Sequence, residues 1–298
     1  MASAENNMEK LKIRQIRYEF TCSQSLMLHQ ELPSITIRGA FGYALAQVIA
    51  RRAGIPELED QVALYKEFFM PQNDGTMNSR DRELARPFVL RGSFTRPDRR
   101  SIIIEAILFG IATEYESLFD EVFKTMAKMG LGPRNQVCDM EKILSNMVEL
   151  PDPEQLPFLL VTFLTPCSRL KSQGTVFRDE LPFHALCARL IDRVEELNQL
   201  YGDKEPFHSY EEIGQLKAAA QQIIYKRLSG GVYQVNRISG RTGDYMKLDG
   251  FLGTMEYYGD FTPFREYLRY LPFINLGRFN VFGCGWCRIE YSEKEVYY

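Results

Sequence analysis

Residues 35–50 read ITIRGAFGYALAQVIA, and this segment indicates the first helix of the fold. Its apolar residues recur at helical spacing, namely Ile37, Phe41, Leu45, Val48 and Ile49. This spacing predicts a helix with one buried face. In the preceding segment, residues 11–22, the later part alternates between apolar and polar side chains, as a half-buried strand does. A strand followed by an amphipathic helix is a common opening of an α+β domain.

The rest of the first half continues in the same way. Short apolar runs have the length of strands, and a strong apolar stripe predicts another helix. The predicted order is strands at 86–91 and 101–112, a helix at 114–129 and a strand at 137–150, with an additional helix at 58–69.

The order recurs after Pro151 and Pro153, which we interpret as a linker. The predicted elements are a strand at 158–163, helices at 182–201 and 213–228, strands at 233–238 and 248–258, a short helix at 261–271 and a strand at 282–291. Each half fits a βαββαβ unit. The sequence therefore predicts an α+β protein of two ferredoxin-like (RRM-like) domains, residues 1–153 and 154–298.

Composition is that of an ordinary globular protein, since 45% of the 298 residues are apolar and 25% are charged. No apolar run reaches the roughly 18 residues that span a bilayer. Residues 1–10 lack the apolar core of a secretory signal. We therefore expect a cytoplasmic protein without membrane association.

Charge is distributed unevenly along the chain. The net charge of −3 is unlike that of a uniformly basic nucleic-acid-binding domain. Residues 86–100, however, contain five arginines and one acid, and residues 226–247 contain five cations and one acid. Such stretches suit a polyanion lying along one face. A solvated surface would look the same, so charge alone leaves both interpretations open.

The chain contains six cysteines, at positions 22, 138, 167, 187, 284 and 287. In a cytosolic protein this scatter predicts reduced and mostly buried thiols. Cys284 and Cys287 have CxxC spacing, but no second pair completes a zinc site. We favour two packed thiols over a structural metal, and we expect neither metal nor cofactor.

Three parts of the chain resemble the RAMP superfamily of CRISPR-associated proteins, specifically its pre-crRNA processing endoribonucleases. Residues 32–45, LPSITIRGAFGYAL, are similar to the family's opening of its first helix. The start of the second domain is similar at VTFLTP (161–166), PFHAL (182–186) and LYG (200–202). The last part contains RISGR (237–241), LDGFLG (248–253), YGD (258–260) and LGRFNVFGCG (276–285). It resembles the family's basic strand, glycine turn, short helix and terminal glycine-rich loop, in that order.

The resemblance covers most of the chain. It implies the RAMP arrangement of two ferredoxin-like domains, binding of CRISPR repeat RNA, and single-site cleavage without a metal ion. Such cleavage needs the 2′-hydroxyl to attack the adjacent phosphorus, which leaves a 2′,3′-cyclic phosphate and a 5′-hydroxyl. A general base and a general acid each contribute about 10²- to 10⁴-fold, and cations stabilise the charge that develops on phosphorus oxygens.

His29 is the predicted general base. It lies in the polar link between the first strand and the first helix, and the resemblance places the family's catalytic histidine in or near that helix. An exposed loop histidine is the alternative. His184 falls in the first turn of a helix and is interpreted as structural, and His208 has no evident partner in sequence.

Some relatives without a catalytic histidine use Tyr, Lys or Arg, so Tyr43 and Arg38 are reserve candidates. Tyr43 is two positions from Phe41 and therefore projects away from the apolar stripe of the helix. A hydroxyl that faces a ligand and ordinary packing both remain open for it.

The predicted RNA contacts are Arg237, Arg241, Lys247 and Arg278. Guanidinium groups suit phosphate because they bind it through two parallel hydrogen bonds. Arg237 and Arg241 would share one face of a strand, although an edge strand protected by charge would carry the same residues.

Gly277, Gly283 and Gly285 are also predicted to bind RNA. Without a Cβ, their backbone amides can approach a phosphate closely. The alternative is that Gly283 and Gly285 only permit close packing.

Two hypotheses about function follow from the resemblance. The leading one is an endoribonuclease that matures guide RNAs from precursor transcripts, and the alternative is a non-catalytic RAMP subunit that binds crRNA in a CRISPR effector complex. The expected partner is CRISPR repeat RNA, with other effector subunits and a homodimer left open. A third hypothesis is an unrelated ferredoxin-like enzyme that acts on a small molecule.

Overall fold

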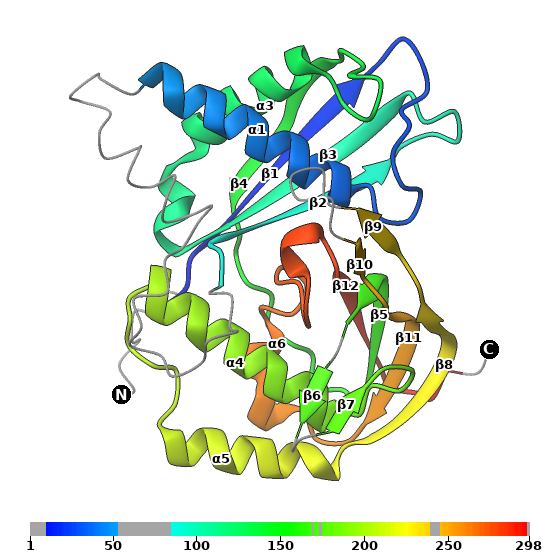
Figure 1. The fold of residues 1–298 in the computed structure, drawn as a ribbon. Helices are drawn as coiled ribbons and strands as arrows, with labels where there is room; N and C mark the ends of the chain where they lie inside the picture. The colour runs from blue at the N-terminus through cyan, green and yellow to red at the C-terminus, as the bar shows by residue number, and fades with distance from the viewer. Residues whose placement is uncertain (1–9, 53–84, 169, 173–174, 239–244, 297–298) are drawn as a thin grey trace.

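The computed structural model describes residues 10–52, 85–168, 170–172, 175–238 and 245–296. The helix predicted at 58–69 and the predicted RNA contact Arg241 lie outside these ranges. Figure 1 shows two modules, one above the other, each built around its own sheet.

The first module has βαββαβ order. Its elements are β1 (Ile13–Thr21), α1 (Ser34–Arg52), β2 (Phe88–Phe94), β3 (Ser101–Phe109), the 3₁₀ turn η2 (Gly110–Glu114), α3 (Glu116–Met129) and β4 (Asp139–Met147). The antiparallel sheet has the strand order β2-β3-β1-β4. Because the first strand is central and the helices follow the first and third strands, this is the ferredoxin-like topology.

The second module repeats that topology with the strand order β12-β5-β11-β8. Its main elements are β5 (Phe158–Cys167), α4 (Phe183–Tyr201), α5 (Tyr210–Ala219), β8 (Ile224–Tyr233), β11 (Gly250–Tyr258), α6 (Arg265–Leu268) and β12 (Cys287–Ser292). Smaller elements are the strand pairs β6 (Leu170–Ser172) with β7 (Thr175–Phe177) and β9 (Asn236–Ile238) with β10 (Tyr245–Lys247), and the 3₁₀ turns η3 (Ala220–Gln222), η4 (Thr262–Phe264) and η5 (Asn280–Phe282). The predicted fold class is confirmed. The division at residues 153 and 154 stays a proposal.

The helix predicted at 213–228 is wrong in its second half. Ser209 caps α5 in a capping box with Glu212, so the helix starts earlier than predicted and ends at Ala219. Residues 224–233 form β8 instead, paired with β11 along its whole length. β8 is an edge strand, and most of its residues are exposed. It therefore lacks the alternation by which a strand is recognised in sequence.

The boundaries of other predicted elements also differ, and the strand predicted at 233–238 is divided between the last residue of β8 and the separate strand β9. The strand predicted at 282–291 begins at Cys287, because residues 280–282 form the turn η5. The helix predicted at 261–271 contains a single short α-helical segment, Arg265–Leu268, preceded by the turn η4.

Strands β2 and β3 of the first sheet are buried on both faces, whereas β4 is largely exposed. On one face, Phe41 of α1 packs on Phe88, Phe119 and Phe123 with ring centroids 5.3–5.6 Å apart. On the other face, Val89 and Phe109 belong to the same apolar core as Phe183 of α4. β3 is consequently buried at almost every position. The two modules therefore share a core.

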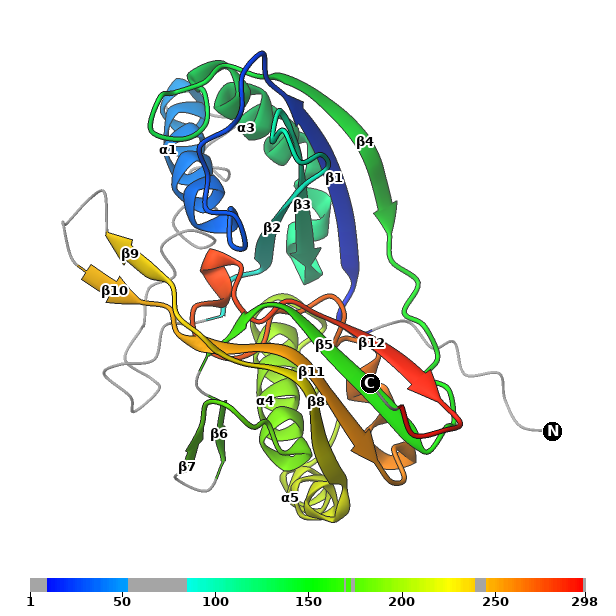
Figure 2. The ribbon, with the colours of Figure 1, turned by 90° about the vertical axis from the view of Figure 1, so that its right-hand side faces the viewer.

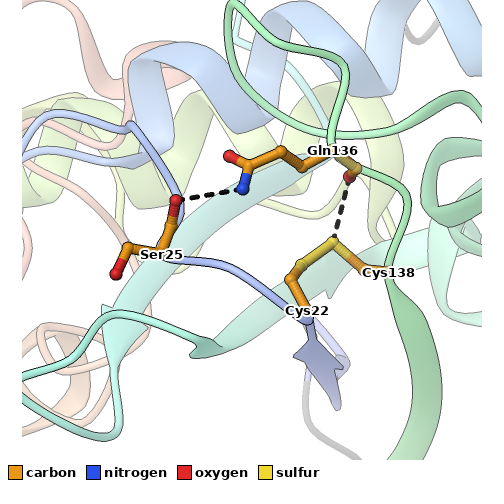
Figure 3. Close-up of a disulfide and its surroundings, with 4 residues drawn as sticks. All are labelled: Cys22, Ser25, Gln136 and Cys138. Atoms are coloured by element: carbon orange, nitrogen blue, oxygen red, sulfur yellow. Dashed lines mark hydrogen bonds between the residues drawn. A yellow bond between two sulfur atoms is a disulfide. The ribbon is translucent and has the colours of Figure 1, made fainter.

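A disulfide joins Cys22 to Cys138, which corrects the prediction that all six thiols are reduced. β1 and β4 pair antiparallel with Thr21 opposite Asp139. Cys22 directly follows β1 and Cys138 directly precedes β4. They are therefore also opposite each other, with Cα atoms 4.6 Å apart (Figure 3). The sequence does not reveal this pairing because 116 residues separate the cysteines.

The other four cysteines are free and buried, as predicted. Within the described ranges, no helix combines the length and the apolar character that crossing a bilayer requires.

Candidate functional site

The link between β1 and α1 carries His29, and the protein holds this link from two sides. On one side, the Leu26 amide donates to the Arg99 carbonyl over 2.9 Å, from the turn between β2 and β3. On the other side, the Gln136 side chain donates to the Ser25 carbonyl over 3.0 Å, beside the disulfide (Figure 3). His29 therefore lies on a loop with defined backbone contacts.

The His29 ring turns its Nδ1 atom toward its own loop. Nδ1 accepts a hydrogen bond from the Leu32 amide over 3.2 Å and lies 3.5 Å from Glu31 Oε2. The side chain is 34% exposed. The two partners of Nδ1 require opposite protonation, because Leu32 needs a lone pair there and Glu31 needs a proton. In either state Nε2 is the nitrogen left for a ligand.

Glu31 connects this loop to the second module. The Tyr233 hydroxyl at the end of β8 hydrogen bonds to Glu31, and burial together with this bond raises the pKa of Tyr233. Figure 2 shows β9 and β10 extending from β8 and β11 toward the first module. A polar chain thus runs from Tyr233 through Glu31 to His29.

A small apolar cluster holds the same three parts together. We call it the junction cluster, and its buried members are Leu32, Val235, Leu248 and Cys284. Leu32 precedes α1, Val235 and Leu248 flank β9 and β10, and Cys284 lies in the glycine-rich loop, residues 276–286. Segments more than 200 residues apart in sequence therefore meet beside His29.

Two of the predicted cations lie at this junction. The Arg38 guanidinium of α1 is 5.5 Å from the ring centroid of Phe282, and the Arg278 guanidinium is 4.9 Å from that of Phe279. The Phe279 and Phe282 rings are themselves 6.4 Å apart. Arg38 and Arg278 thus both contact the aromatic pair of the glycine-rich loop.

The glycines of this loop permit close contacts. Gly283 has φ +82°, and a Cβ there would overlap the side chain of Ser34 at the start of α1. Its amide donates to the Asn280 carbonyl, and the amide of Gly285 donates to the Pro166 carbonyl. These contacts fit the close-packing alternative. RNA contact by Gly283 and Gly285 stays a prediction.

Gly277 also has a positive φ, of +81°, and a Cβ there would overlap the Ser168 carbonyl. The next residue, Arg278, donates its amide to that carbonyl over 2.9 Å. The backbone is thereby fixed while the Arg278 side chain is exposed.

Arg91 anchors the glycine-rich loop to the first sheet and was missed by the sequence analysis. Its side chain is 3% exposed, and its Nη1 lies 3.1 Å from Glu105 Oε2. The same guanidinium donates to Asn275 Oδ1 and to the Phe273 carbonyl, and it lies 5.1 Å from the ring centroid of Trp286. The signal that could have revealed this pair was a charged residue in each of two apolar predicted strands, Arg91 at the end of residues 86–91 and Glu105 within residues 101–112.

The Glu105 carboxylate is ionised although it is buried. Burial favours its neutral form, but the charges of Arg91 and Arg17 and hydrogen bonds from Arg17 and Gln15 outweigh burial and lower the pKa of Glu105. Arg17 and Gln15 donate to Oε1 over 2.8 and 2.7 Å. The pair with Arg91 is therefore ionic at neutral pH.

Two other predicted RNA contacts, Arg237 and Lys247, belong to the pair of strands β9 and β10. Arg237 belongs to β9, opposite Met246 of β10, and Lys247 is exposed at the end of β10. Val235 and Leu248, beside these strands, belong to the junction cluster. β9 and β10 therefore start close to the loop that carries His29.

Tyr43 is 62% exposed on α1, as its position off the apolar stripe predicts. The other two histidines lie in the second module. His184 packs against Phe177 with ring centroids 5.6 Å apart, and burial lowers its pKa. His208 has a partner after all, since its Nδ1 lies 3.1 Å from the Tyr267 hydroxyl.

Cys284 and Cys287 are packed thiols, as interpreted. Cys284 belongs to the junction cluster and Cys287 to the core shared by the two modules. Burial raises the pKa of each to about 12, so both stay protonated at neutral pH. In the part of the chain that the structure describes, no group of three or more His, Cys, Asp or Glu residues is placed to hold a metal ion.

The chain is similar to solved structures of other proteins. The structure of Thermus thermophilus Cas6 superposes with a TM-score of 0.55 at 12% identity, covering 94% of this chain and 99% of the other. A Cas6-related protein from Pyrococcus furiosus gives a TM-score of 0.47 at 12% identity, covering 93% and 98%. No curated protein matches the chain.

Two family models match successive parts of the sequence. Residues 11–155 match a family described as an N-terminal domain, and residues 161–287 match the family of the CRISPR-associated endoribonuclease Cas6. The fold and these matches together define a RAMP-type protein with two ferredoxin-like modules. The match of residues 161–287 to the Cas6 endoribonuclease family confirms the resemblance noted from the sequence.

Proposed function

We propose that the protein is an endoribonuclease that cuts CRISPR repeat RNA within precursor transcripts and so releases guide RNAs. One observation carries the proposal. His29 accepts a hydrogen bond from Leu32 of the junction cluster, and Arg38 and Arg278 contact the Phe282 and Phe279 rings that pack against the same cluster. These are the kinds of group that RNA cleavage by the 2′-hydroxyl requires.

In the proposed reaction, His29 Nε2 takes the proton of the 2′-hydroxyl while the 2′-oxygen bonds to phosphorus. The bond from phosphorus to the 5′-oxygen breaks, and this oxygen takes up a proton from water. The products are a 2′,3′-cyclic phosphate and a 5′-hydroxyl. Proton transfer and charge stabilisation both come from side chains, so the proposed reaction needs no metal.

Glu31 sets the condition under which His29 acts as a base. While Nδ1 accepts from Leu32, the proton of the neutral ring is on Nε2, and Nε2 cannot accept another. When the proton is on Nδ1, it pairs with Glu31, which is 3.5 Å away, and Nε2 has a free lone pair. The catalytic state is the second one.

Cations of the junction would stabilise the phosphorus oxygens as charge develops there. Arg38 and Arg278 are assigned this role because both contact the aromatic pair Phe279 and Phe282 beside α1. Arg237, Arg241 and Lys247, on β9, β10 and the segment between them, are assigned to the RNA backbone.

A specific observation favours the second candidate, a non-catalytic crRNA-binding subunit. The hydrogen bond from Leu32 to Nδ1, at 3.2 Å, is shorter than the contact with Glu31, so the tautomer it favours is the one that cannot act as a base. Such a protein would bind the same RNA and leave it intact.

The test uses end-labelled repeat RNA, purified full-length protein and excess EDTA. We expect one discrete cut, a 2′,3′-cyclic phosphate on the upstream fragment, and no cut when the nucleotide at the cleavage position is 2′-deoxy. Binding without cleavage would overturn the nuclease in favour of the subunit. Absence of any salt-dependent RNA binding would overturn both.

A further inference from the structure

The turn between β2 and β3 is a compact cationic site that the proposed reaction does not use. Residues 95–100 contain three arginines, of which Arg96 and Arg100 are exposed and Arg99 is half-buried. None of the three forms an ion pair with a carboxylate of the described residues. The one acid of the turn, Asp98, accepts the Arg100 amide over 3.2 Å and so closes the turn. The turn thus carries a net positive charge.

The backbone of this turn is fixed to the loop that carries His29. The Cys22 amide donates to the Arg100 carbonyl over 2.8 Å, and the Ser25 hydroxyl donates to the Asp98 carbonyl over 2.6 Å. Arg99 itself adopts φ 55°, in the left-handed region that a side chain seldom occupies. The surrounding hydrogen bonds hold that conformation, so the arginines are presented from a defined backbone.

Arg99 reaches the residue next to His29. Its Nη2 donates to Gln30 Oε1 over 2.6 Å, and its guanidinium lies 5.3 Å from the ring centroid of Phe94. A guanidinium oriented by stacking and by one hydrogen bond keeps its other N–H groups available for an oxyanion. The cationic site is therefore adjacent in space to the proposed proton acceptor.

We infer that Arg96, Arg99 and Arg100 form a second phosphate-binding site, which holds the backbone of the RNA strand that leads to His29. The inference rests on the proposed function. Guanidinium groups contact phosphates without reading bases, so the site would set the position of the strand and not its sequence. It lies on the first module, whereas the assigned RNA contacts of β9, β10 and the glycine-rich loop lie on the second.

Salt dependence of binding measures these contacts directly. Each phosphate contact to a single strand contributes about 0.7 to the slope of log K against log salt concentration. At 0.1 M salt this corresponds to about 5-fold in affinity per contact, or about 25-fold for two.

The test variant is the double substitution Arg96→Gln with Arg100→Gln, since both side chains are exposed. We expect the slope of log K against log salt concentration for repeat RNA to be shallower than that of the wild type by about 1.4. The control is Arg51→Gln with Arg189→Gln, which removes the same charge from the end of α1 and from α4. The control should keep the wild-type slope, and circular dichroism should show both proteins folded.

The outcomes separate this inference from the proposed function. An unchanged slope in the test variant, or an equal decrease in the control, overturns the phosphate site while wild-type cleavage still supports the nuclease. A wild-type protein that neither binds nor cuts repeat RNA overturns the proposed function itself. Adding Arg99→Gln to the double variant should make the slope shallower by about a further 0.7.

Discussion

The two modules share one topology but differ in what their loops contribute. In the first module, the loop after β1 carries His29 and Glu31, and the turn after β2 carries three arginines. In the second module, the glycine-rich loop turns its Gly283 and Gly285 amides to carbonyls of the protein and packs against α1. The shared scaffold therefore positions both sets of loops, and the loops differ in the chemical groups that they present.

The modules differ in burial as well. β3 of the first module is buried on both faces, since helices cover one face and the second module covers the other. β8 of the second module is largely exposed. β2 and β3 therefore form the buried layer between the two halves, and buried charge within it should matter most.

Arg91→Met should have the largest effect. It leaves Glu105 buried without its one buried charge partner among the described residues, which costs about 3–5 kcal/mol of unfolding free energy. Urea unfolding followed by the fluorescence of Trp286, the single tryptophan, measures the loss beside the substituted side chain. The matched control is Arg17→Met, whose side chain is 44% exposed and should cost far less. Equal midpoints for Arg91→Met and the wild type would contradict a structural role for the pair.

The same pair makes a prediction about pH. The pKa of Glu105 is lower in the folded protein than its ordinary value, so its stabilisation is present above that ordinary value and is lost as pH falls through the folded one. In Arg91→Met, burial then dominates and the pKa of Glu105 rises. The difference in unfolding free energy between wild type and variant should therefore narrow from neutral pH toward acid pH. A constant difference between pH 7 and pH 3 would count against an ionised Glu105.

Loss of the disulfide should come next. Cys22 and Cys138 close a loop across 116 positions within the first module, and such a crosslink is worth about 2–4 kcal/mol. Cys22→Ser with Cys138→Ser should lower the free energy of unfolding by that amount and should therefore lower the thermal midpoint as well. Dithiothreitol should move the wild type toward the double variant and leave the variant unchanged. Identical melting of wild type with and without reductant would show that the crosslink is absent in solution.

Glu31→Gln should have the smallest of these effects. The amide cannot accept the Nδ1 proton as strongly as the carboxylate, so fewer molecules have a free lone pair on Nε2. We expect single-turnover cleavage to slow about 10-fold with RNA affinity unchanged. Nitrogen NMR of labelled histidine should show the neutral His29 ring shifting toward the tautomer with the proton on Nε2. An unchanged tautomer ratio would remove Glu31 from the mechanism.

Much of the fold was predictable, because the helices have clear apolar stripes and the element order repeats. β8 was missed because its exposed residues carry no period. The disulfide and the pair of Arg91 with Glu105 depend on strand register, and Arg91 lies directly opposite Glu105 in the sheet. Without register, neither pairing follows from sequence.

The candidate site was predictable in its chemistry but not in its assembly. His29, Arg38 and Arg278 were selected by residue type and resemblance. The contacts among Leu32, Tyr233 and the glycine-rich loop form only when the modules meet. Glu31 and Tyr233, 202 positions apart by their numbers, gave no local pattern that relates them.

The central claim is that a histidine of the first module performs proton transfer on RNA held across both modules. Its most direct test compares single-turnover cleavage of repeat RNA by wild type, His29→Ala and Tyr43→Phe at saturating protein. The account predicts a loss of at least about 100-fold for His29→Ala with affinity nearly unchanged, and a wild-type rate for Tyr43→Phe. A wild-type rate for His29→Ala would contradict the claim, and a large loss for Tyr43→Phe in the same assay would transfer the role to that tyrosine.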